Sequence, residues 1–228
     1  MSSRSSKHSK SGRENRSPYG AKPRQSLRPV LPVIVVLCDD SKTAPAYFYA
    51  LKLRVKENVT VDVVGLKCSE QTPAQVIAQA KSKAKELRGK AKKFKSGDAV
   101  WVLIDCEATK AQHDAAKQAA AEGAKHGIQV ARSNPCFEIW TLAHLFDTGE
   151  AFNDCAAVNQ TLRAKWKEQF KQEMPKKSQA DYAKLMDMRG EAVKRCKRRN
   201  RKNGGSWTEV YKVIEAIEQA AKPADGQP

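Results

Sequence analysis

LPVIVVLC, at residues 31–38, runs directly into Asp39 and Asp40, and this junction decides the fold. An uninterrupted apolar run bounded by polar residues is typical of a β-strand buried on both faces. Strands of that kind belong to parallel sheets covered by helices. In an open parallel sheet, ligands bind beyond the carboxyl ends of the strands, which is where these two acids stand.

A second apolar run ends in the same way. AVWVLI, at residues 99–104, is followed by Asp105, and Glu107 comes two residues later. If the two strands are neighbours, their ends gather four carboxylates into one cluster. Clustered carboxylates repel one another unless a hard cation joins them, and Mg²⁺ favours such oxygen ligands. The sequence therefore predicts a magnesium site at this edge of the sheet.

The first two thirds of the chain alternate between strand and helix patterns. Further strands are expected at residues 59–66 and 128–132, and helices at residues 44–57, 72–94, 109–126 and 136–146. Four successive β–α units predict an α/β fold with a parallel, doubly wound sheet and right-handed crossovers.

The remainder of the chain shows helical patterns only. We expect helices at residues 162–174, 180–198 and 206–221. They form either a helical extension packed beside the sheet or a small second lobe. The predicted organisation is a disordered basic arm (1–28), an α/β domain (29–146) and a helical extension (147–228).

The charge balance points to a polyanionic partner. The chain has 228 residues, with 42 Lys and Arg against 25 Asp and Glu, and a net charge of +17. We expect salt-sensitive binding to nucleic acid, RNA or DNA. The strongest basic block of the folded body is KRCKRRNRK at residues 194–202, with Arg189 before it. The alternatives are a solvated helix face, and a scaffold whose charge serves solubility alone.

The six cysteines form no recognisable framework. They are scattered without a C-x-x-C pair, so reduced thiols are favoured over disulfides or a zinc site. The apolar runs are too short to span a membrane, and the polar N-terminus does not have the pattern of a secretory signal. We therefore expect a cytoplasmic protein without a membrane partner.

Three boxes carry a family resemblance. CDDSKTAPAYF at residues 38–48 resembles the C-E-G-x-K-T-E-P-x-Y-F box of RloB-like proteins. IDCE at residues 104–107 stands where that family has D-x-D, and SNPCFEIW at residues 133–140 matches its S-N-P-x-F-E-x-W box. GGSWTEVY at residues 204–211 is only loosely similar to its terminal segment.

This resemblance implies a function in phage defence. RloB-like proteins include abortive-infection components of the AbiLii type and are TOPRIM-like. In TOPRIM enzymes, acids after the first and third strands hold Mg²⁺ (or Mn²⁺) for phosphodiester chemistry. An AAA-type ATPase partner is often encoded nearby, and homo-oligomerisation stays open. The resemblance thus implies an antiphage nuclease, a metal-dependent hydrolase.

The chain departs from the family pattern at its acidic positions. Asp39 replaces the expected Glu, Asp40 replaces Gly, Ala44 replaces the second Glu, and Glu107 replaces the second Asp of D-x-D. Mg²⁺ demands near-ideal octahedral geometry, and catalysis suffers from small misplacements. A catalytically inactive nucleic-acid-binding or regulatory subunit is therefore the alternative.

The expected catalytic roles fall on the strand ends. Asp105 and Glu107 hold one or two ions, and Asp39 or Asp40 completes the ligand shell or acts as general base. Lys42 neutralises a phosphate. Glu138, one turn into the next helix, is a further candidate ligand.

The expected substrate contacts come from two segments. Ser133 and Asn134 precede a helix and would direct its N–H groups toward a phosphate. The basic contacts to the nucleic-acid backbone are Arg189, Lys194, Arg195, Arg198 and Arg199.

Overall fold

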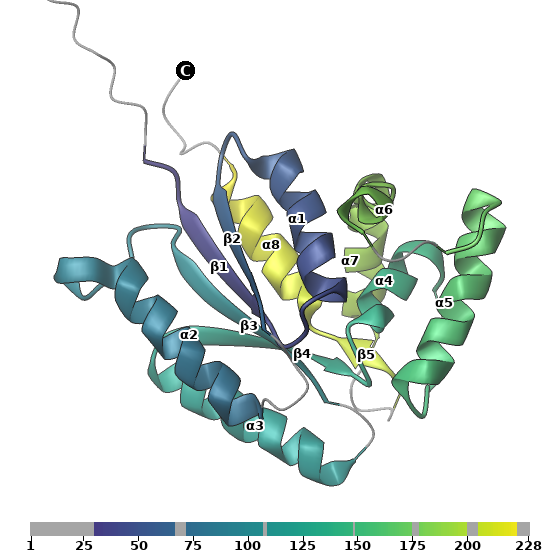
Figure 1. Cartoon of the computed structure of the whole chain (residues 1–228), viewed down its shortest axis with the longest axis horizontal. Helices are drawn as coiled ribbons and strands as arrows, with labels where there is room; N and C mark the ends of the chain where they lie inside the picture. Colours follow the sequence, from purple (N-terminus) through teal and green to yellow (C-terminus); the bar gives the residue numbers. More distant parts are fainter. Residues whose placement is uncertain are drawn as a thin grey trace, which may run out of the picture. The chain divides into compact units, whose positions relative to one another are not determined.

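Figure 1 shows the computed structural model of the chain. The structure describes residues 30–66, 72–106, 109–147, 149–174, 178–199 and 205–222. One compact unit begins at Leu31 and contains all the helices and strands described below. The basic arm expected at residues 1–28 lies outside the described residues.

Strands and helices alternate through the first two thirds of the chain, as expected. Their order is β1 (Val33–Cys38), α1 (Thr43–Val55), β2 (Thr60–Gly65), α2 (Pro73–Arg88), the 3₁₀ turn η1 (Gly89–Ala91), β3 (Ala99–Asp105), α3 (Lys110–Lys125) and β4 (Ile128–Asn134). Helices dominate the rest: α4 (Glu138–Leu145), α5 (Cys155–Phe170), α6 (Gln179–Ala183), η2 (Met186–Met188), α7 (Arg189–Arg198), the short strand β5 (Trp207–Thr208) and α8 (Val210–Ala220).

The five strands of the described residues form one mostly parallel sheet in the order β2-β1-β3-β4-β5. Strands β1 to β4 pair in parallel, and β5 joins β4 antiparallel. The α/β class is therefore confirmed. The chain moves from β1 outward to β2 and then returns to β3 on the other side of β1. This reversal makes the carboxyl ends of β1 and β3 a topological switch point, where open α/β sheets bind their ligands.

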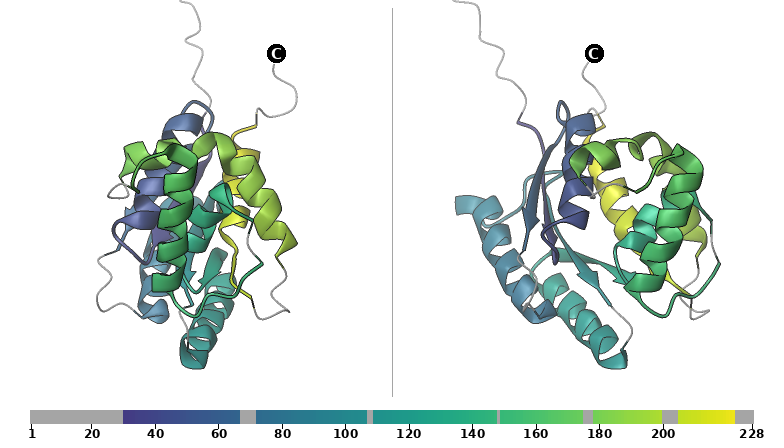
Figure 2. Two further views of the ribbon diagram at one scale, coloured as in Figure 1. Left: turned by 90° about the vertical axis from the view of Figure 1, so that its right-hand side faces the viewer. Right: turned by 45° about the vertical axis from the view of Figure 1, so that its right-hand side comes forward.

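Helices cover both faces of the sheet (Figures 1 and 2). Helices α2 and α3 pack on one face, and α1, α4, α7 and α8 contribute to the core on the other. Burial on both faces explains why the sequence of strand β1 does not alternate between apolar and polar residues. Ile34 and Val36 enter one core, whereas Val35 and Leu37 enter the other.

The C-terminal segment differs from expectation at its start. A helix was expected at residues 206–221, but Trp207 and Thr208 pair with β4 and α8 begins at Val210. A partly buried ion pair fixes this turn, because Nε of Arg132 lies 3.0 Å from Oε2 of Glu209. Helix α8 then contributes Val213, Ile214 and Ile217 to the core that it shares with β1.

Other helix boundaries also differ, for local reasons. The helix expected at residues 72–94 begins after the predicted N-cap Thr72, but it ends at Gly89, where φ is +53°. The helix expected at residues 162–174 begins earlier, at Cys155, because the Asp154 carboxylate caps it. The helix expected at residues 180–198 is divided into α6, η2 and α7. No helix in the described ranges has the length and apolar character that a membrane crossing requires.

Candidate functional site

Asp39 and Asp105 meet at the topological switch point. Strands β1 and β3 are neighbours, with Cys38 opposite Leu103, so each strand places an acid at the same edge. The backbone N–H of Asp105 donates a hydrogen bond of 2.8 Å to Oδ2 of Asp39. The carboxyl ends of the two strands are therefore joined directly.

The Asp105 side chain lies in a poorly solvated, negatively charged environment. Burial raises the pKa of Asp105 well above its usual range, and Asp39, Glu138 and Asp40 raise it further. The backbone N–H of Phe137, just before α4, donates a hydrogen bond to Asp105 and opposes this shift. Acids from β1, β3 and α4 therefore influence one another at this edge, as clustered carboxylates would.

Asp40 is engaged by the backbone of its own loop. Its carboxylate accepts hydrogen bonds from the N–H groups of Thr43 (2.6 Å), Ala44 (3.2 Å) and Lys42 (3.3 Å). It thus satisfies N–H groups at the start of α1, which have no partner within the helix. Burial raises the pKa of Asp40 despite these bonds. The side chain of Lys42 is exposed beside this loop.

Ser133 and Asn134 occupy the end of β4. The Ser133 hydroxyl is buried and shares a 2.8 Å hydrogen bond with the Thr208 hydroxyl of β5. Nδ2 of Asn134 lies 3.5 Å from the carbonyl oxygen of Gly205. Both side chains therefore contact the segment around β5, and their contact with substrate stays a prediction.

Glu138 is buried at the first position of α4, and its carboxylate faces the start of α5. Oε2 of Glu138 lies 3.3 Å from Sγ of Cys155. Among the described residues, the ligand atoms of Glu138, Cys136 and Cys155 form the one group of three that lies within 4.8 Å. The described strand-end carboxylates form no such group of three, and Glu107 lies outside the described residues.

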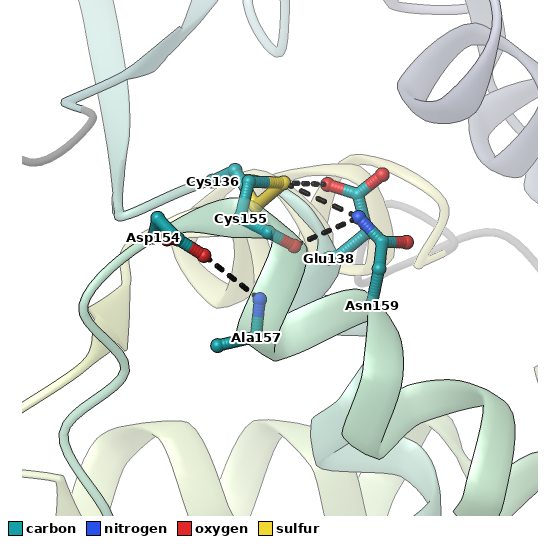
Figure 3. The surroundings of a disulfide bond; sticks show 6 residues. All are labelled: Cys136, Glu138, Asp154, Cys155, Ala157 and Asn159. Carbon is teal, nitrogen blue, oxygen red and sulfur yellow. Dashed lines mark hydrogen bonds between the residues drawn. A yellow bond between two sulfur atoms is a disulfide. The ribbon is translucent and has the colours of Figure 1, made fainter.

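The expectation of reduced thiols is wrong for one pair of cysteines. Cys136 and Cys155 form a disulfide with a Cα–Cα distance of 5.7 Å (Figure 3). They are 19 residues apart, and only the packing of α4 against α5 brings them together. Cys38, Cys106 and Cys196 are free and buried, as small hydrophobic residues would be.

The cations of α7 have partners within the chain. Nη1 of Arg195 donates to the carbonyl oxygens of Ala143 (2.9 Å) and His144 (3.1 Å) at the end of α4. The others form ion pairs: Arg189 with Glu218, Lys194 with Glu191, and Arg198 with Asp147.

Arg199, at the end of α7, differs from these four. Its guanidinium nitrogens are buried, without a hydrogen-bond partner in the described part of the chain. The structure thus gives four of the five expected nucleic-acid contacts an intramolecular role, and their contact with substrate stays a prediction.

Comparison with known proteins identifies one family. No curated protein and no solved structure matches the chain. The family described as RloB-like protein matches residues 34–217, which include both strand ends, α4 and most of α8. This match confirms the resemblance seen in the sequence boxes. The chain belongs to the RloB-like family.

Proposed function

We propose that the protein is a TOPRIM-like, Mg²⁺-dependent nuclease that acts in antiphage defence. The observation that carries this proposal is the junction of Asp39 and Asp105 at the switch point of the sheet. A cluster of desolvated like charges is destabilising by itself, and a divalent cation would offset the repulsion. Perturbed carboxyl groups at a ligand-binding edge are typical of functional sites.

The donor atoms at this edge suit magnesium. Asp39, Asp105 and Glu138 offer carboxylate oxygens only, and hard cations prefer such oxygens. A bound ion would stabilise the attacking and leaving oxygens of a phosphodiester displacement. The chain orients its own ligands through the Asp105 N–H, which holds Asp39, and through the Phe137 N–H, which holds Asp105.

The substrate and partner follow from charge and family resemblance. A net charge of +17 favours RNA or DNA, and the exposed Lys42 stands next to the acidic edge, where it would meet a phosphate. The RloB-like family supports a defence function together with an ATPase partner, which would release or trigger the nuclease.

A second candidate is a non-catalytic subunit that binds nucleic acid or regulates the ATPase. The carboxylate arrangement favours it, because Asp40 is engaged in capping α1 and the strand-end acids do not form a tight triad in the described ranges. The change from Glu to Asp at position 39 points the same way, since it shortens one ligand.

The experiment is a cleavage assay with the full chain, alone and together with the ATPase that we propose as its partner. Transfer RNA, single-stranded DNA and plasmid are incubated with Mg²⁺ or Mn²⁺, and cleavage is compared between wild type and Asp105→Asn. The matched control is Asp114→Asn, the same substitution at an exposed acid of α3. We expect metal-dependent cleavage that Asp105→Asn lowers at least about 100-fold and the control leaves unchanged.

Two results would contradict the nuclease. One is equal cleavage by Asp105→Asn and wild type, which would show that Asp105 is not part of the active site. The other is the absence of cleavage under every condition, the ATPase and phage extract included, together with salt-dependent binding of nucleic acid. That second result would support the non-catalytic subunit.

A further inference from the structure

Exposed lysines gather where the chain passes from α2 into β3. The connection contains η1 and leads directly into β3. Gly89 and Lys92 both have positive φ, at +53° and +54°, and the Lys92 N–H donates a 3.2 Å hydrogen bond to the Gly89 carbonyl oxygen. The chain therefore turns tightly after α2. Five lysines around this turn are exposed, and together they are named the lysine patch: Lys85, Lys90, Lys92, Lys93 and Lys95.

The acids near the lysine patch are already engaged. Residues 85–98 contain six basic residues and two acids. Glu86 pairs with Lys83 at 3.2 Å, and the Asp98 carboxylate accepts a 2.9 Å hydrogen bond from the backbone N–H of Val33. No lysine of the patch forms an ion pair with another residue that the structure describes. The positive charge of the patch is therefore open to an external anion.

The turn that carries the lysines is fastened to the fold. Nη2 of Arg88 donates a hydrogen bond to the carbonyl oxygen of His126, and its guanidinium lies 4.3 Å from the ring centroid of Phe94. Phe94 is partly buried and packs against the core beneath α2 and α3. The sixth cation and the aromatic ring thus contact the fold, whereas the lysines are in solvent. A surface that is held in place loses less conformational freedom when it binds a partner.

Other cations of the chain have internal partners. On the neighbouring helix surfaces, Lys81 pairs with Glu122 and Lys117 pairs with Asp114. The expected nucleic-acid contacts of α7 are largely used in the same way. The lysine patch therefore differs from both regions.

The dipole of α2 accounts for only part of the patch. A helix C-terminus favours cations, but the effect falls off within the last turn. Lys85 lies in the last turn of α2, which ends at Arg88. The three lysines at positions 92, 93 and 95 lie beyond that turn, so their clustering has no explanation in the stability of the helix.

The most basic stretch of the sequence joins the fold beside this turn. A Cβ atom added at Gly97 would lie 2.9 Å from Cβ of Pro32, so the two residues are in close contact. The sequence of residues 1–29 carries eight basic residues and one acid, and it is covalently joined to this end of the sheet. Two basic stretches of the sequence therefore meet the fold at one place.

The lysine patch is separate from the acidic edge. It leads into the first residue of β3, whereas Asp105 is the last residue of that strand. The seven residues of β3 span about 20 Å. In Figure 1, α2 runs from the carboxyl ends of the strands to its last turn at the left of the view. The lysines therefore stand at the opposite end of the sheet from the proposed catalytic carboxylates.

We propose that the lysine patch is an exosite for the phosphate backbone of a nucleic acid, RNA or DNA. Lysine ammonium groups bind phosphates as point charges, so the exosite holds strands without reading their sequence. The exosite rests on the nucleic-acid partner proposed above, but it does not depend on cleavage. It takes over the backbone contact that the sequence suggested for α7.

Equilibrium binding by the full chain tests the proposal. Fluorescence anisotropy measures the affinity for labelled single-stranded RNA, single-stranded DNA and duplex DNA over a range of salt concentrations. Divalent cations are left out, so that binding is measured without cleavage. The test variant neutralises three charges of the patch: Lys92→Gln, Lys93→Gln and Lys95→Gln.

The matched control neutralises three exposed lysines elsewhere in the described chain. These residues follow α1, α5 and α8: Lys56→Gln, Lys171→Gln and Lys222→Gln. We expect the test variant to bind at least about tenfold more weakly, with a log–log salt slope shallower by about 2. The control should lose less than about threefold, because charges more than a Debye length away are screened. Both variants should keep the melting temperature of wild type, since the changed side chains are exposed.

Three outcomes overturn the exosite. If the test variant and the control bind alike, the patch is not the contact, although the nucleic-acid partner stands. If wild type binds no nucleic acid even at low salt, the exosite and the nucleic-acid partner both fail. If the test variant loses binding only to vesicles of anionic phospholipid and keeps wild-type affinity for nucleic acid, the patch serves a membrane surface instead.

Discussion

The acidic strand ends and the basic helix α7 are both charged stretches of the sequence, but their charges have opposite surroundings in the structure. In α7, Arg189, Lys194, Arg195 and Arg198 bind acids or carbonyl oxygens of the same chain. At the strand ends, burial raises the pKa of Asp105, and the neighbouring acids raise it further. Charges that are neutralised internally belong to the fold, whereas buried like charges call for an external partner.

The largest expected effect tests the structural role of α7. Arg195→Met removes the guanidinium that donates to the carbonyl oxygens of Ala143 and His144. These two carbonyl groups at the end of α4 then lack their charged hydrogen-bond donor. We expect the free energy of unfolding to fall by about 2 kcal/mol, since hydrogen bonds to charged groups are worth about that much. Denaturant unfolding measures it. Unchanged stability combined with weaker binding of nucleic acid would reverse the assignment.

An opposite effect is expected at the strand ends. Asp105→Asn removes one negative charge from a desolvated cluster and keeps an oxygen that accepts from the Phe137 N–H. Without divalent cations at neutral pH, we expect the variant to be more stable than wild type, because it lacks the desolvated negative charge. A loss of stability in metal-free buffer would show that Asp105 is instead a structural acid.

The same carboxyl group predicts a pH dependence. The folded-state pKa of Asp105 is raised, so the stability gained from its protonated form is fully present below its ordinary pKa of about 3.9. That stability is lost as the pH rises through the folded-state pKa. In metal-free buffer, wild type should therefore become less stable relative to Asp105→Asn as the pH increases from about 4. A constant difference across pH would contradict the desolvated, repelling cluster.

The smallest effect is expected at the exposed pair of Arg198 and Asp147. Their side chains are 63% and 46% exposed, and such ion pairs contribute little. Arg198→Ala should change the free energy of unfolding by less than about 0.5 kcal/mol and leave nucleic-acid affinity unchanged. If filter binding instead shows lower affinity and a smaller salt dependence, α7 contacts the phosphate backbone after all.

The sequence was sufficient for the parallel part of the sheet. Residues 31–38 and 99–104 are long apolar runs. A strand that is buried on both faces has no alternation of apolar and polar residues, and such a run is a strong signal of a buried strand. Strand β5 has two residues and no period to detect, so the sequence pattern predicts a helix there instead. Its position depends on pairing with β4, which sequence patterns do not show.

The candidate site was predictable in part. The two buried strands are recognisable in the sequence, so the acids that follow them are predicted to meet at the carboxyl ends of the strands. Asp105 indeed lies next to Asp39. The capping role of Asp40 depends on the local backbone turn, and the contact of Arg195 with Ala143 spans 52 positions. The approach of Cys136 to Cys155 likewise depends on how α4 packs against α5. Such contacts are set by tertiary structure rather than by spacing.

Thermal unfolding with and without Mg²⁺ tests the central claim most directly, because a ligand that binds the folded state raises its melting temperature. The account predicts that millimolar Mg²⁺ raises the melting temperature of wild type and of Asp114→Asn, and leaves that of Asp105→Asn unchanged. An equal rise in Asp105→Asn, or none in wild type, would contradict a cation site at the ends of β1 and β3.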